Sequence, residues 1–193
     1  TDAEISEAAD AARGADVAIV VLGERSGLTD DAISGETRDR VSLGLPGRQQ
    51  ELLEAVVATG TPAVLVLVSG RPLAIPWAAQ HCAAILHAWV PGECGAQAIV
   101  DVLTGETNPG GKLPISVPHH VGQLPLSYSH RPTGGHSNWN VEYVDCTNRP
   151  LWPFGHGLSY TSFELSELSL SPAEIPPDGR TTARVRVTNS GDR

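Results

Sequence analysis

The chain has 193 residues, 40% of them hydrophobic and 18% charged, which is the composition of a globular protein with one full domain and part of another. Its formal net charge of −9 argues against binding to nucleic acid or to an anionic membrane surface, because both require a basic footprint. No apolar stretch reaches the length of a transmembrane helix, so we expect neither nucleic acid nor a membrane as a partner.

Apolar periodicity predicts alternating helices and strands over the first 118 residues. Apolar side chains recur at helical spacing in four segments, which are 2–14, 47–59, 76–81 and 93–104. In the first of these, Asp2 is the expected N-cap and Gly14 the expected end. Short apolar runs rich in β-branched residues predict strands at 16–22, 63–69 and 83–90, with a short fourth strand at 113–117.

The predicted fold class is α/β. Continuous apolar runs such as 16–22 and 63–69 are typical of strands that are buried on both faces, as in parallel sheets. Strands and helices that alternate through short connections favour a mostly parallel sheet flanked by helices on both faces, which here is a partial α/β sandwich.

Beyond residue 118 the pattern changes twice. Residues 119–162 are rich in Pro, Gly, Asn, Ser and His, and we expect a long connecting excursion that packs back on the sandwich. Apolar and polar residues then alternate in two segments around a turn at 176–179, which predicts the first strands of a β-sandwich at 163–170 and 181–189. The expected domains are 1–118, 119–162 and 163–193. Because both ends of the sequence have patterns typical of a domain interior, we interpret the chain as an internal fragment of a longer protein.

The carboxyl ends of the predicted strands are the expected place for function, because ligands of open α/β sheets bind in the crevice beyond them. Three loops leave those ends, at 23–46, 69–76 and 91–94. In the first and longest, Glu36 stands on a Gly-flanked segment where its carboxyl group can reach a ligand. Its neighbours Arg38, Asp39 and Arg40 can hold the loop or tune that acid. By spacing alone, the pattern fits a solvated loop with surface ion pairs better than a catalytic loop.

The other polar candidates favour structural roles. Arg71, in the Gly-Arg-Pro turn after the second strand, is expected to brace a neighbouring loop rather than to contact a ligand. Glu93 stands near a helix N-terminus, where it stabilises its own helix dipole. The adjacent His119 and His120 point in different directions on an extended chain and have no further ligand at a suitable spacing, so we expect no metal and no cofactor.

The aromatic and cysteine residues leave alternatives open. Trp139 and Trp152 lie in the predicted excursion, where rings can stack on sugars but more often anchor a loop. The three cysteines form no Cys-x-x-Cys pair, and an odd number leaves at least one thiol free or paired outside this sequence. The disulfide state therefore stays open for Cys82, Cys94 and Cys146.

Eight motifs, in a fixed order, cover nearly the whole chain. They are the segments 23–24, 34–40, 43–53, 68–73, 89–93, 105–114, 124–128 and 152–163. Each motif alone is weak, but the ordered set is specific, and it resembles glycoside hydrolase family 3, which includes β-glucosidases and β-xylosidases. The resemblance implies a (β/α)8-like barrel with a nucleophilic aspartate, then an α/β sandwich, and often a fibronectin type III-like domain. This chain is similar to the later part of that sandwich and the first strands of the third domain.

The resemblance also implies a catalytic role. In family members a loop of the sandwich reaches over the barrel and supplies the acid/base glutamate, which corresponds to Glu36 by its place in the 34–40 motif. Glu24, at the end of the first strand, is the rival candidate, and its earlier position makes it less able to reach. The residues expected to support the loop are Arg38, Asp39, Arg40 and Arg71.

On this basis we expect a fragment of a retaining exo-acting β-glycosidase, a β-glucosidase or β-xylosidase, whose nucleophile lies in the N-terminal barrel domain of the same polypeptide. The expected substrate is a β-linked oligosaccharide or an aryl glycoside, and the fragment alone is expected to be inactive. The alternatives are a non-catalytic carbohydrate-binding or scaffolding module, and a free-standing doubly wound domain that binds a small ligand. Many enzymes of the family act outside the cytoplasm, so the resemblance fits a secreted or periplasmic protein.

Overall fold

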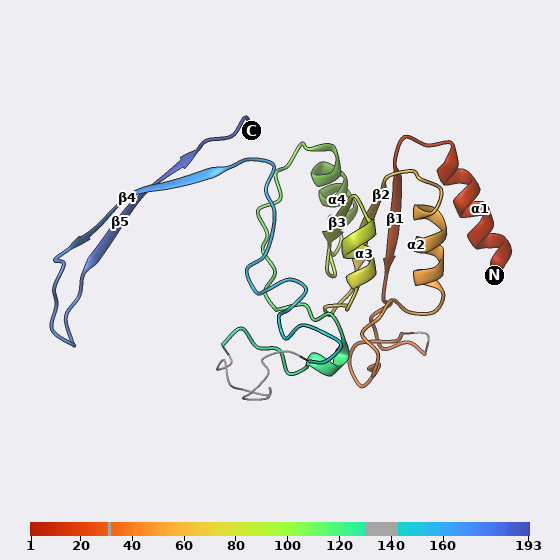
Figure 1. Ribbon diagram of the computed structural model, residues 1–193, viewed down its shortest axis with the longest axis horizontal. Helices are drawn as coiled ribbons and strands as arrows, with labels where there is room; N and C mark the ends of the chain where they lie inside the picture. The colour runs from red at the N-terminus through yellow and green to blue at the C-terminus, as the bar shows by residue number, and fades with distance from the viewer. Residues whose placement is uncertain (31, 130–142) are drawn as a thin grey trace. The chain divides into compact units, whose positions relative to one another are not determined.

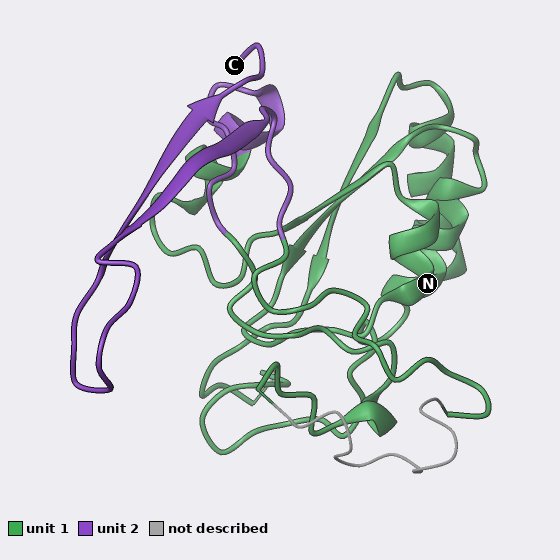
Figure 2. Ribbon diagram, turned by 60° about the vertical axis from the view of Figure 1, so that its left-hand side comes forward, with its two compact units in different colours: residues 1–99, 112–156 green, residues 100–111, 157–193 purple. Residues whose placement is uncertain are grey.

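The computed structural model describes residues 1–30, 32–129 and 143–193 (Figure 1). Trp139 and part of the excursion predicted over 119–162 lie outside the described residues. Two compact units divide the chain, the first formed by residues 1–99 and 112–156 and the second by 100–111 and 157–193 (Figure 2). The domain limits expected from the sequence stay a prediction. No helix among the described residues is long and apolar enough to cross a membrane.

The first unit contains a three-stranded parallel sheet, as the sequence predicts. Its strands lie in the order β1 (Ala18–Gly23), β2 (Ala63–Val68) and β3 (Ala84–His87). The register pairs Ala18 with Ala63 and Val64 with Ala84. The helices of this unit are α1 (Asp2–Arg13), α2 (Gln49–Val57) and α3 (Pro76–His81), and a 3₁₀ turn, η1, spans Val121–Gln123. The helix α4 (Gly95–Thr104) begins in the first unit, and its residues from 100 onward belong to the second. The predicted α/β class is confirmed.

One face of the sheet forms the core. Val20 of β1 and Leu65 of β2 share this face by register, and they pack with Leu53 of α2 and Ala78 of α3. Leu53 and Leu65 are completely buried. Each fully buried side chain of this size stabilises the fold by about 1.5–3 kcal/mol, so this layer holds α2 and α3 in place against the strands.

The opposite face of β1 departs from the prediction. Ile19 is 54% exposed and Val21 is 62% exposed, so this strand is buried on one face only. Val20 and Leu22 on the core face of the same strand are buried, so side chains cover β1 from one side only, whereas Val66, which pairs with Val21 in the central strand β2, is fully buried. A continuous apolar run shows only that a strand can be buried on both faces. Whether both faces are buried depends on which other elements pack against them.

Two smaller predictions were also wrong. Residues 113–117 form no strand of the sheet, and they pair instead with the returning segment 152–156. The Leu113 amide donates to the His156 carbonyl at 2.8 Å, and Val117 bridges to Trp152. Pro114 within the segment and Pro118 after it lack the amide donors of a regular ladder. The N-cap of α1 is Thr1 rather than Asp2, because Thr1 and Glu4 form a capping box that satisfies the first helical amides.

The second unit contains an antiparallel pair, β4 (Phe163–Ser171) and β5 (Thr182–Asn189). Both predicted strands are present, but the register shifts between Ser166 and Ser169, where Glu167 has a positive φ of 54°. The Gly179 amide closes the turn between them by donating to the Pro176 carbonyl at 2.8 Å. Asn108, in the segment that follows α4, contacts the residues that lead into β4. Its Oδ1 accepts a hydrogen bond from the Tyr160 amide at 2.9 Å.

Candidate active site

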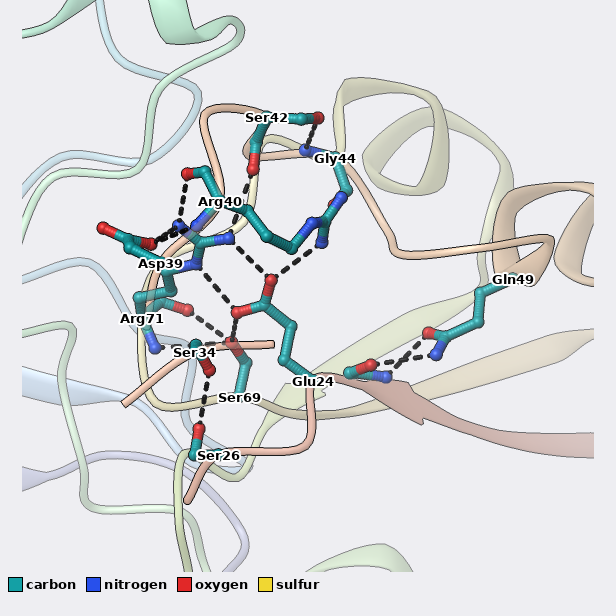
Figure 3. A network of polar contacts seen from close by, with 11 residues as sticks. Glu24, Ser26, Ser34, Asp39, Arg40, Ser42, Gly44, Gln49, Ser69 and Arg71 are labelled. Carbon is teal, nitrogen blue, oxygen red and sulfur yellow. Dashed lines mark hydrogen bonds and ion pairs between the residues drawn. The ribbon is translucent and has the colours of Figure 1, made fainter. Parts of the chain in front are cut away.

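The longest connection at the carboxyl edge of the sheet joins the end of β1 to the start of α2. Gly23 begins it, and a side chain there is impossible because a Cβ atom would lie 1.7 Å from the Val68 carbonyl oxygen. The side-chain amide of Gln49 fixes the other end. Its Oε1 accepts from the Gly23 backbone amide and its Nε2 donates to the Gly23 carbonyl, both at 2.9 Å (Figure 3). The two ends of the loop are thereby held side by side.

A buried carboxylate stands at the centre of this loop. Glu24, whose side chain is fully buried, accepts from Arg71 Nε and Nη2 at 2.8 Å each, which is a two-pronged ion pair (Figure 3). Arg40 Nη1 donates to the same carboxylate at 2.9 Å, and Ser69 Oγ at 3.3 Å. Two guanidinium groups therefore share one acid, and each is mostly shielded from solvent.

This environment sets the charge of Glu24. Burial raises the pKa of its carboxyl group, but hydrogen bonds and the charges of Arg71 and Arg40 outweigh burial, so the pKa lies below its usual value. The same pair raises the pKa of the Arg71 side chain. A carboxylate that keeps its charge at neutral pH is poorly suited to donate a proton, which argues against Glu24 as the general acid.

Arg71 also reaches the returning half of the loop. Its Nη1 donates to the Arg40 carbonyl at 3.0 Å and its Nη2 to the Ser42 carbonyl at 3.2 Å. The same guanidinium forms an ion pair with Asp39 (Figure 3). Arg40 contacts the Gly44 carbonyl at 3.3 Å. One side chain from the loop after β2 thus holds several backbone positions of the loop after β1.

The tip of the loop is cross-linked by a second set of contacts. The Gly27 amide donates to the Ser34 carbonyl at 3.1 Å, and the hydroxyl oxygens of Ser26 and Ser34 lie 2.8 Å apart. Arg38 Nη2 donates to Asp30 Oδ1 at 2.9 Å and Nη1 to the Asp30 carbonyl at 3.2 Å. The outgoing and returning limbs are therefore joined on both sides of residues 35–37.

Glu36 lies between these two sets of contacts. It is exposed, and it stands on a tight turn that the Arg38 amide closes by donating to the Gly35 carbonyl at 3.3 Å. Its carboxylate has no hydrogen bond or ion pair with any residue that the structure describes. An open depression of about 540 Å³ adjoins the turn, and its lining comes from the loops after β1, β2 and β3: Ser26, Ser34, Gly35, Thr37, Arg38, Asp39, Gly70, Arg71 and Val90.

The histidine pair and the cysteines lie apart from this loop. His120 Nδ1 accepts from the Gly122 amide at 3.1 Å and caps η1, while the His119 amide donates to Gln123 Oε1 at 2.6 Å. In the described part of the chain, no group of three or more His, Cys, Asp or Glu side chains is arranged to hold a metal ion. All three cysteines have free thiols.

Three features of this edge escape sequence reasoning. Glu24 is the centre of the ion-pair network. In the sequence, the only sign of this is that Glu24 stands at the end of a predicted strand and that arginines follow further along the chain. Thr37 has a positive φ of 62°. His87, at the end of β3, stacks on Trp89 with ring centroids 3.9 Å apart, and its Nε2 atom is buried without a hydrogen-bond partner. Burial lowers the pKa of His87 to about 4, so its ring is neutral near pH 7.

A parallel sheet flanked by helices, with a cross-linked, acid-bearing loop at its carboxyl edge, followed by an antiparallel pair of strands, defines an α/β protein with a short β-hairpin. The model of the glycosyl hydrolase family 3 C-terminal domain matches residues 2–160. The chain belongs to glycosyl hydrolase family 3, in agreement with the resemblance that its motifs carry.

Named relatives are glycosidases. A periplasmic β-glucosidase of Salmonella typhimurium is 47% identical over 197 residues, which cover 99% of this chain and 25% of that protein. A β-xylosidase of Formosa agariphila is 41% identical over 186 residues, covering 96% of this chain and 25% of that protein. The chain therefore spans about a quarter of the length of the curated relatives it matches.

Solved structures agree with the fold. A β-glucosidase from Erythrobacter marinus superposes with a TM-score of 0.84 at 42% identity, over 98% of this chain and 25% of that one. A β-glucosidase from Listeria innocua in complex with glucose superposes with a TM-score of 0.88 at 32% identity, over 100% of this chain and 27% of that one.

Proposed function

We propose that this chain supplies the acid/base glutamate, Glu36, of a retaining exo-acting β-glycosidase, a β-glucosidase or β-xylosidase. One observation carries the assignment. Among the described acidic residues of the loop, Glu24, Asp30 and Asp39 each pair with an arginine, whereas Glu36 is exposed and has no such partner. A general acid must be free to approach a substrate oxygen, and Glu36 meets this requirement.

The chemistry needs a second carboxylate, for which we propose an aspartate in an N-terminal barrel domain of the same polypeptide. Retaining glycosidases place their two carboxyl groups about 5–5.5 Å apart. The nucleophile attacks the anomeric carbon while Glu36 protonates the departing glycosidic oxygen, and Glu36 then accepts a proton from the water that releases the sugar. The substrate is a β-linked oligosaccharide or an aryl glycoside, and this chain alone lacks hydrolytic activity.

The surrounding contacts suit this role. The network of Glu24, Arg40 and Arg71 fixes the base of the loop, and the Arg38–Asp30 pair fixes its tip. We propose that Arg38, Asp39, Arg40 and Arg71 act through the loop and not on the substrate. A loop held at both ends keeps Glu36 in one region of space, which lowers the entropy lost when the catalytic geometry forms.

Glu36→Gln in the full-length protein tests the assignment. For substrates with poor leaving groups, kcat should fall by about 10²–10⁴-fold, because the amide cannot protonate the departing oxygen. For aryl glycosides with strongly activated leaving groups, the rate of sugar transfer to the enzyme should fall much less. The control is Glu54→Gln, an exposed acid on α2, which should leave both rates unchanged.

Equal losses in the rate of sugar transfer to the enzyme on both substrate types would contradict the role of Glu36 as the acid. A full-length Glu36→Gln protein with unchanged turnover would favour the non-catalytic carbohydrate-binding or scaffolding module instead.

A further inference from the structure

The turn that carries Glu36 contains a strained residue. Thr37, the next residue, has a φ of 62°, in the left-handed region. Steric clash of Cβ with the backbone disfavours this region for residues other than glycine, and the branched side chain of threonine makes the clash worse. A residue stays in such a conformation only where its surroundings leave no other choice.

The side of the turn before Glu36 leaves little freedom. Gly35 has a φ of 124°, and a Cβ atom there would lie 3.0 Å from both the amide nitrogen and the carbonyl oxygen of Gly27. The backbones of residues 27 and 35 are therefore in direct contact. The Gly27 amide also donates to the Ser34 carbonyl. Residues 34 and 35 therefore cannot approach residue 27 without a clash, and they cannot move away from it without breaking this hydrogen bond.

The side after Thr37 is held by charge. Arg38 reaches Asp30 through two hydrogen bonds, and Asp39 forms an ion pair with Arg71. The closing hydrogen bond from the Arg38 amide to the Gly35 carbonyl completes the turn. Thr37 therefore lies between two fixed points, and its left-handed backbone is the conformation that joins them.

The consequence falls on Glu36. Its carboxylate makes no hydrogen bond with the described residues, so within this part of the chain only the backbone of the turn sets where its Cα–Cβ bond points. A general acid that is misplaced by about 1 Å can lose about 10²-fold in rate. We propose that Thr37 is a positioning residue, whose left-handed conformation keeps the turn in one geometry and aims Glu36 at the leaving group. This inference rests on the proposed function of Glu36.

The test is Thr37→Gly in the full-length protein, since glycine adopts the left-handed region freely and also many others. We expect an unfolding midpoint no lower than that of the wild type, because the strain is removed. We expect kcat/KM for unactivated β-glycosides to fall at least fivefold, while kcat/KM for an activated aryl glycoside changes less than twofold, because kcat/KM reports the transfer of the sugar to the enzyme and an activated leaving group needs little protonation. Thr37→Asn, which tolerates positive φ but keeps a Cβ atom, should restore most of the lost rate.

Thr29→Gly is the matched control, because Thr29 is an exposed threonine of the same loop without a positive φ. It should leave the leaving-group dependence of kcat/KM unchanged. A Thr37→Gly protein with a lowered midpoint, with wild-type kcat/KM, or with equal losses of kcat/KM on both substrates would overturn the inference, as would Thr37→Asn without rescue. If Glu36→Gln behaves as an acid variant and Thr37→Gly as wild type, only this inference fails. If Glu36→Gln spares unactivated substrates, the proposed function fails and this inference with it.

Discussion

Glu24 and Glu36 belong to the same loop but have opposite surroundings. Glu24 is buried against two guanidinium groups, and Glu36 is exposed without a charged partner among the described residues. The first arrangement keeps a carboxylate charged and fixed, and the second leaves a carboxyl group available to a substrate. This contrast separates the structural acid from the proposed catalytic one.

The lowered pKa of Glu24 makes the stability of the protein depend on pH. Because the folded state holds this proton less tightly than the unfolded state, the stabilisation is complete above the ordinary pKa, near 4.5, and is lost as pH falls through the folded value. Glu24→Gln removes the charge and should lower the free energy of unfolding by about 2–3 kcal/mol at pH 7. The difference between variant and wild type should shrink as pH falls below 4.5.

Unfolding of the full-length protein at a series of pH values, followed by tryptophan fluorescence, measures this difference. Glu7→Gln, an exposed acid on α1, is the control and should follow the wild type at every pH. A constant difference between Glu24→Gln and wild type down to pH values near 3 would show that the charge of Glu24 does not stabilise the fold.

At the scale of elements, the sequence predicts most helices and strands because their apolar runs are continuous and their ends carry Gly or Pro. The short helix α3 agrees at both ends, since Pro76 fixes its start. The uncovered face of β1 was not predictable, because burial depends on neighbours and not on the strand itself. The pairing of 113–117 with 152–156 was missed because it joins segments far apart in the sequence.

The candidate site likewise has features that the sequence points to and features that depend on contacts between distant segments. By spacing alone the 34–40 segment fits a solvated loop better, and only the resemblance of its motif to the family points to Glu36, whose catalytic role stays a proposal. The Glu24–Arg71 pair joins two different loops, and no local pattern reports such a contact. The left-handed Thr37 was also unpredictable, because threonine is a poor signal for positive φ and the constraint comes from Gly27 and Arg38 on either side.

Arg71 links the loop after β2 to the loop after β1, so its replacement tests the link between elements. Arg71→Lys keeps the charge but loses the planar fork that contacts both Glu24 oxygens and two carbonyls. We expect the free energy of unfolding to fall by about 2 kcal/mol. We also expect faster hydrogen exchange at the amides of residues 24–44, because the loop loses its brace.

Arg13→Lys is the matched control, since Arg13 pairs with Asp10 on the exposed face of α1. An exposed pair of this kind contributes little, so this variant should resemble the wild type in both measurements. Unchanged exchange in Arg71→Lys would show that the loop keeps its conformation without the fork.

At the scale of the whole molecule, the chain spans about a quarter of the relatives that it matches, and those relatives are named β-glucosidase or β-xylosidase. We propose that the reaction is divided between two domains: an N-terminal barrel binds and attacks the sugar, and this chain delivers and later accepts a proton.

Chemical rescue of Glu36→Ala in the full-length protein tests that division most directly. With an activated aryl β-glycoside, the variant should form the glycosyl-enzyme but release it slowly, because no base activates water. Azide needs no base, so it should accelerate turnover and yield a glycosyl azide of retained β configuration. Absence of acceleration and of the β-azide product, in a folded variant that still binds substrate, would contradict the assignment of Glu36 as the acid/base.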